Sequence, residues 1–74
     1  MDSELTVIYE WDEDGWWIAT IPEVPGAFSQ GRTKEEAREN ALDALRELMA
    51  ARREMALRNR PPGSSTESLV LSGL

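Results

Sequence analysis

Two short segments on either side of an acidic turn restrict the start of this sequence to a β-hairpin. From Leu5 to Trp11, apolar side chains stand at every second position, the period that gives a strand one apolar face. Asp12 to Gly15 then turn the chain, because Asp tolerates turn conformations and Gly adopts a positive φ without steric cost. Aromatic and β-branched residues from Trp16 to Ile21 form the returning strand, which ends at Pro22 because proline donates no ladder hydrogen bond.

A stiff connection predicts a third strand after the hairpin. Pro22 to Gly26 contain two residues of fixed φ followed by glycine, which reverses the chain again into the short strand Ala27 to Gln30. The three strands are therefore expected to form an antiparallel meander.

A capping box predicts where a helix begins. The hydroxyl of Thr33 can accept a hydrogen bond from the Glu36 amide, and the Glu36 carboxylate is expected to reach back to the Thr33 amide. Strong helix formers continue to about Arg58, before Pro61. Apolar side chains spaced by three and four residues give this helix one stripe: Ala37, Ala41, Ala44, Leu45, Leu48 and Met49.

The last segment, Thr66 to Leu71, has the composition of a fourth strand. The element order is then β-β-β-α-β, an α+β fold in which an antiparallel meander is followed by a crossover helix on one face. We place the C-terminal strand beside the first, in the spatial order 3-2-1-4. A chain of 74 residues fits one domain, residues 1–74.

The composition argues against most catalytic mechanisms. The sequence contains no histidine and no cysteine, so thiolate chemistry, the usual zinc ligands and the common general base are missing. The acids of Asp12 to Asp14 are better interpreted as a solvated turn than as a metal site, because the other ligand positions of a calcium loop are absent. Ser29 has no histidine to activate it. We predict no enzyme activity and no catalytic, cofactor or metal residues.

Charge divides the sequence into two parts. Residues 1–31 contain no Lys or Arg, and their seven acids are Asp2, Glu4, Glu10, Asp12, Glu13, Asp14 and Glu23. Basic residues concentrate between Arg52 and Arg60, where they complement the helix dipole. A contact of this basic segment with a partner or with nucleic acid is the less favoured alternative. The acidic part favours a basic partner.

Trp16 and Trp17 point to opposite faces of the second strand, because neighbouring side chains on a strand alternate. One of them therefore lies on the sheet face away from the helix. Two interpretations remain open for it: partial burial under loops or long charged side chains, or a place in a protein interface, where Trp is enriched.

The predicted helix is longer than the domain it belongs to. From Lys34 to Arg58 it spans about 37 Å at 1.5 Å per residue, whereas a compact domain of this size is about 29 Å across. Its distal part would leave apolar side chains in water, so we predict a homodimer or larger homo-oligomer. The candidate interface is Leu48, Met49, Met55 and Leu57. Two alternatives are a helix that ends near Ala51 and pairing through the edge strands.

Five consecutive motifs resemble the HicB-like antitoxin family, also grouped as UPF0150. They are the acidic turn Asp12 to Gly15, the aromatic strand after it, Pro22 to Gly26, Ser29 to Gly31, and the helix start Thr33 to Ala37. The resemblance extends from about Leu5 to Leu48.

This resemblance implies a reduced ribonuclease-H-like fold without that enzyme's activity. It also implies an antitoxin domain that neutralises a small basic messenger-RNA-cleaving toxin of the HicA-like type by covering its RNA-binding surface. We place Trp16, Trp17, Glu23 and Phe28 near such a surface. The alternative function is a homo-oligomeric structural or regulatory module without a toxin.

Further expectations concern where the protein acts. No part of the sequence resembles the DNA-binding module of longer family members, so DNA binding by this chain alone is not expected. No apolar run reaches the roughly 18–20 residues of a membrane span, and we expect a cytoplasmic protein.

Overall fold

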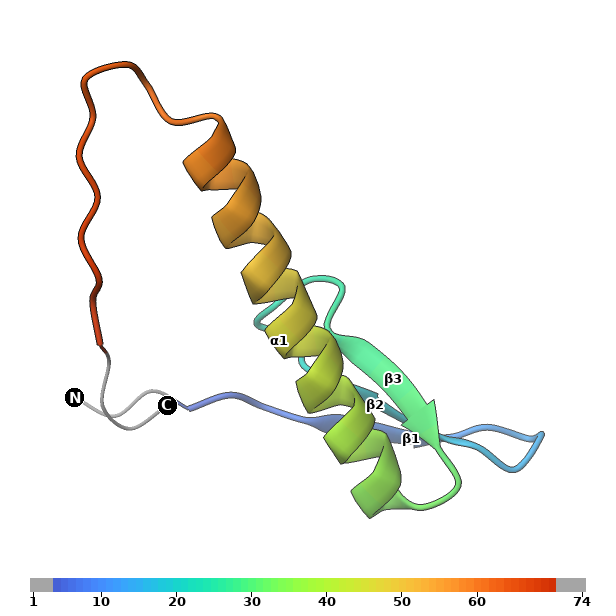
Figure 1. Cartoon of the computed structure of the whole chain (residues 1–74). Helices are drawn as coiled ribbons and strands as arrows, with labels where there is room; N and C mark the ends of the chain where they lie inside the picture. Colours follow the sequence, from blue (N-terminus) through green and yellow to red (C-terminus); the bar gives the residue numbers. More distant parts are fainter. Residues whose placement is uncertain (1–3, 71–74) are drawn as a thin grey trace.

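A three-stranded antiparallel sheet and one long helix form the fold in the computed structural model, which describes residues 4–70 (Figure 1). The elements are β1 (Ile8–Trp11), β2 (Trp17–Thr20), β3 (Phe28–Gly31) and α1 (Lys34–Arg58). The sheet order is β1-β2-β3, so the predicted meander and the α+β class are confirmed.

The turn between β1 and β2 forms as its residue types predict. The Asp12 carboxylate accepts a hydrogen bond from the Asp14 amide at 2.7 Å, and the Gly15 amide donates to the Asp12 carbonyl at 3.1 Å. Gly15 has a φ of +89°, which a residue with a side chain rarely adopts. The acids of this turn therefore project at one end of the sheet.

Strand register assigns each side chain to a face. Tyr9, Ala19 and Ser29 are aligned across the three strands, and so are Ile8, Thr20 and Phe28. Ala19 is fully buried in the core, so the face with Tyr9 and Ala19 lies beneath α1. Ile8, Thr20 and Phe28 belong to the opposite face, which we call the outer face.

Small residues let α1 lie close to the sheet. The buried core consists of Ala19, Ile21, Ala27, Ala37 and Ala41. Gly31 ends β3 directly beneath the first turn of α1, where a Cβ atom would lie 2.5 Å from the Ala37 nitrogen. The helix packs on β3 and β2 through this close approach.

The helix begins and ends where the sequence predicts. The Thr33 hydroxyl accepts from the Glu36 amide at 3.0 Å, as expected for a cap. The return bond differs from our prediction, because the Glu36 carboxylate accepts from the Arg32 amide at 3.3 Å and not from Thr33. The carboxylate reaches one residue further back, to the amide that precedes the cap.

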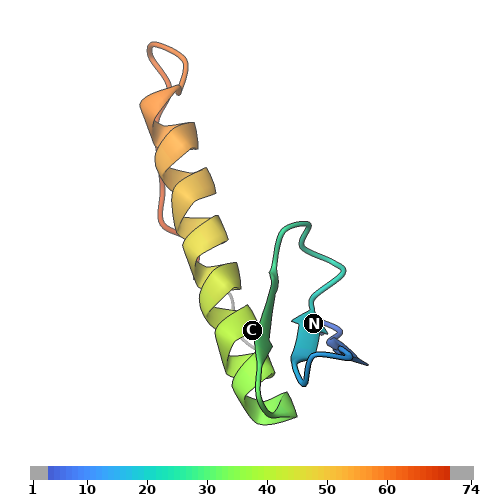
Figure 2. The same ribbon diagram turned by 90° about the vertical axis from the view of Figure 1, so that its right-hand side faces the viewer.

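The distal part of α1 extends beyond the sheet, as predicted (Figure 2). Residues 50–58 are all exposed. The molecule measures 53 × 28 × 15 Å, and its radius of gyration is 15.7 Å, well above the roughly 11 Å of a compact chain of this length. The alternative of a helix ending near Ala51 is wrong.

The predicted fourth strand does not form in the described part of the chain. Residues 64–70 are not in a strand, and Leu71 lies outside the described residues. α1 carries the chain about 37 Å from its first residue before Pro61, and residues 64–70 then run back beside the helix toward the sheet without pairing with β1 (Figure 1).

Candidate protein-binding surface

An apolar patch occupies the outer face of the sheet. Ile8 and Phe28 stand on the two edge strands and are 45% and 60% exposed, with the half-buried Ile18 on the central strand. A shallow hollow of about 190 Å³ is lined by Ile18, Phe28, Ser29 and Gln30. Since α1 covers only the opposite face, the fold leaves this patch open to a partner.

Trp16 lies at the end of this face and is capped by an arginine. The Arg32 guanidinium stacks on the Trp16 ring at 3.7 Å from the ring centre, and it also donates a hydrogen bond to the Gly15 carbonyl at 3.4 Å. Trp16 is half-buried as a result. This geometry favours the interpretation of burial beneath a long charged side chain over that of a freely exposed anchor.

Trp17 lies on the helix-facing side, which confirms that the two neighbouring tryptophans occupy opposite faces. It packs against the core and meets Trp11 edge-to-face, with ring centres 5.1 Å apart. The Lys34 ammonium lies 4.9 Å from the Trp17 ring centre. Trp11 is 58% exposed and was missed as a candidate, although the two-residue period places it on the same face as Tyr9.

Glu23 has a local structural role in the connection between β2 and β3. Its carboxylate accepts hydrogen bonds from the Thr6 hydroxyl at 2.5 Å and from the Thr6 amide at 2.9 and 3.0 Å. These bonds hold the pKa of Glu23 below its ordinary value of 4.5, and the bond from the Thr6 hydroxyl contributes most to this lowering. Glu23 thereby ties the segment that enters β1 to the connection that leaves β2.

The four residues proposed from the sequence therefore do not form one cluster. Trp16 and Phe28 share the outer face, Trp17 is on the opposite face, and Glu23 belongs to a connection. Ile8 and Ile18 complete the outer patch and were not identified, because their membership follows from strand register.

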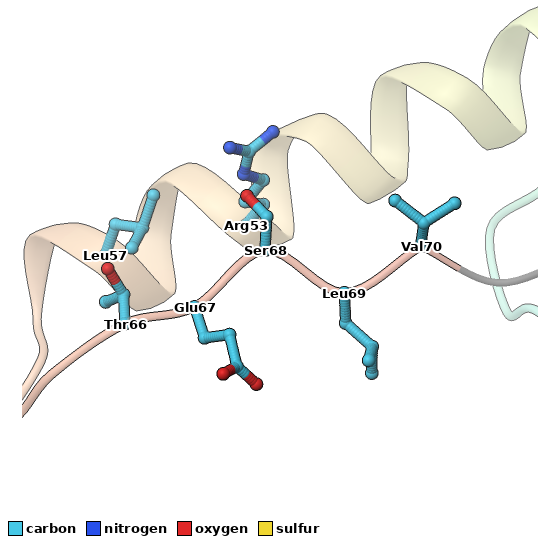
Figure 3. A pocket seen from close by; sticks show the side chains of 7 residues that line it. All are labelled: Arg53, Leu57, Thr66, Glu67, Ser68, Leu69 and Val70. Atoms are coloured by element: carbon cyan, nitrogen blue, oxygen red, sulfur yellow. The ribbon is translucent and has the colours of Figure 1, made fainter.

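The four residues proposed as an oligomer interface also divide into two groups. Leu48 packs against the core. Met55 lies on the same side of α1 as Leu48, seven residues further along and beyond the sheet. Met49 lines a groove beside the core, and Leu57 faces residues 66–70 (Figure 3).

The described residues lack two further kinds of feature. Residues 4–70 contain no group of three or more acidic side chains placed to hold a metal ion. Within the same range, no helix combines the length and apolar character that crossing a membrane requires.

Comparison with known proteins identifies the family. A UPF0150 protein of Synechocystis is 37% identical over 71 residues, which are 96% of this chain and 99% of that protein. This chain belongs to the UPF0150 family. A second UPF0150 protein, from Thermoplasma acidophilum, is 49% identical over 43 residues, 58% of this chain and 62% of the relative.

The UPF0150 chain is also similar to an antitoxin. Antitoxin HicB 1 of Photorhabdus laumondii is 52% identical over 33 residues, 45% of this chain and 21% of that antitoxin, so the match spans about a fifth of the relative. No family model matches the chain, and no solved structure is significantly similar to it. The resemblance predicted from the sequence motifs is confirmed.

Proposed function

We propose that this UPF0150 chain is a non-catalytic antitoxin domain, residues 1–74, that binds a small basic messenger-RNA-cleaving toxin of the HicA-like type and covers its RNA-binding surface. The open outer face of the sheet is the observation that carries this proposal. It presents Phe28 and Ile8 to solvent, at the end of the sheet opposite the acidic turn at Asp12 to Asp14. Similarity to Antitoxin HicB 1 supports the kind of partner.

Phe28 is the anchor of this surface. Its ring is 60% exposed next to the hollow over Ile18, where a partner side chain can replace water on both. The acids of the Asp12 to Asp14 turn, at the other end of this face, attract a basic partner over distance and orient it, so association should weaken as salt rises. Trp16 supports the same face, while Trp17 and Glu23 act indirectly by holding the sheet and its connection in place.

The test is whether an adjacent reading frame encodes a short basic protein, and whether that protein binds this chain. Co-expression should give a complex at low salt, and Phe28→Glu should raise its Kd about 30-fold, equivalent to about 2 kcal/mol. Leu69→Glu is the matched control, because Leu69 is also exposed but lies far from the outer face and should leave the Kd unchanged. Absence of a complex at low salt, or equal binding by Phe28→Glu, would refute the proposal.

The proposed domain carries no enzyme activity despite the reduced ribonuclease-H-like architecture that the family resemblance implies. Magnesium-dependent cleavage of an RNA–DNA hybrid, abolished by Asp12→Asn, would contradict this. We place the function in the cytoplasm, where messenger RNA is cleaved. The second candidate, a homo-oligomeric structural or regulatory module without a toxin, is favoured by the uncovered part of α1. Failure to bind any adjacent basic protein would favour it further.

A further inference from the structure

One flank of α1 is apolar near its middle and is left open by the rest of the chain. Leu42, Leu45 and Met49 line a groove of about 560 Å³ together with Leu5, Val24 and Arg46, and the Arg46 guanidinium is paired with the Asp43 carboxylate at 3.0 Å. Leu5 and Met49 are 44% and 55% exposed, so the groove is not filled from within the molecule.

The same flank continues to the distal end of the helix. Arg53 is one turn beyond Met49, and Leu57 is one turn further. Residues 66–70 pass over this part, but a space of about 610 Å³ separates them from Arg53 and Leu57 (Figure 3). Leu57 remains 45% exposed, so the returning segment does not provide its cover.

Charge along α1 is arranged in two opposite halves. Residues 34–47 contain five acids and three bases, whereas residues 48–58 contain three bases and one acid. Two such helices placed antiparallel bring the basic half of each against the acidic half of the other, with Arg53 of one copy opposite Glu39 of the second. Within residues 4–70, Arg53 forms no ion pair of its own.

We propose that a second copy of this chain covers the flank, through a two-fold axis that sets the two α1 helices antiparallel. A two-fold interface uses the same patch on both subunits, so the patch must be complementary to itself. This flank meets that condition, because its apolar groove lies near the middle of α1 and its opposite charges lie toward the two ends. Met49 of each copy then enters the groove of the other. The inference does not depend on the proposed antitoxin role.

The first test compares two methionines of similar exposure on different sides of the same helix. Light scattering of the wild-type chain at about 100 µM should give twice the monomer mass of 8.3 kDa. Met49→Glu should give a monomer with unchanged circular dichroism. Met55→Glu is the matched control: Met55 is 63% exposed but about 120° away around the helix, so this variant should remain a dimer.

The second test exchanges charges. Arg53→Glu should raise the dimer dissociation constant about tenfold at low salt, and the double variant with Glu39→Arg should restore it. A wild-type monomer, equal loss of the dimer in Met49→Glu and Met55→Glu, or a double variant as weak as Arg53→Glu would each overturn the proposal.

Discussion

Replacing Gly31 by alanine tests how closely α1 must lie against the sheet. A Cβ at this position would stand 2.5 Å from the Ala37 nitrogen and 2.9 Å from both the carbonyl carbon and the Cβ of Glu36. None of these atoms can rotate away, because two belong to the backbone of α1 and the third is fixed to it. Ordinary contact begins near 3.4 Å, so the start of the helix must move by about 0.9 Å.

A shift of this size opens the contacts of Ala37 and Ala41 with the sheet, and overpacking of this kind costs about 1–3 kcal/mol. At about 2 kcal/mol, the melting temperature of a domain this small falls by roughly 8–16 °C. Thermal unfolding at a fixed protein concentration, followed by circular dichroism, measures this fall in the melting temperature. Gly63→Ala is the comparison: its φ of +81° strains any side chain, but nothing lies within 4 Å of its Cβ position, so this variant should melt closer to the wild type than Gly31→Ala. If Gly31→Ala melts within about 1 °C of the wild type, the close approach is not what positions the helix.

Two further predictions concern the first turn of α1 and the segment before β1. Thr33→Ala removes the side chain that accepts from the Glu36 amide and should lower the free energy of unfolding by about 1 kcal/mol in urea titrations, whereas Thr33→Ser should retain most of it. Thr6→Val removes the hydroxyl that lowers the pKa of Glu23, so that pKa should rise toward 4.5 in an NMR titration, and an unchanged titration would contradict the assignment. Because the pKa of Glu23 is lower in the folded state, the ionised carboxylate stabilises the fold above about pH 4.5, and this stabilisation is lost as the pH falls through the folded-state pKa. The wild-type chain should therefore lose more stability on acidification than Thr6→Val.

The parts of this fold that the sequence predicts are those determined by neighbouring residues. The Asp12 to Gly15 turn and the Thr33 cap each depend on side chains that bond within three residues, so their chemistry can be read from the order of the residues. Both ends of α1 were predicted for the same reason, and so was the separation of Trp16 and Trp17 onto opposite faces.

The parts that the sequence did not predict depend on contacts across long separations. Arg32 caps Trp16 from 16 positions away, and the pairing of Ile8 with Thr20 follows from a register that the alternation of residues does not specify. The strand predicted at residues 66–71 failed similarly, because composition indicates that a segment can pair but not whether an edge lies within its reach.

The composition of the core links the binding surfaces to stability. Four of its five residues are alanines, and Ile21 is the only large side chain that is fully buried among residues 4–70. A core of this size buries little apolar area per residue. Much of the apolar area that could still be removed from water therefore lies on the outer face and the α1 flank, where a partner can cover it.

Binding of a partner at these surfaces also stabilises the fold. A ligand that binds only the folded state stabilises it by about 2.7 kcal/mol when the free ligand concentration is one hundred times its Kd. The melting temperature of the isolated chain should therefore rise with protein concentration through the α1 flank, and rise again when a basic partner covers Phe28. Met49→Glu should abolish the first increase and keep the second, whereas Phe28→Glu should keep the first and reduce the second; a variant that loses both would show that the two surfaces are not independent.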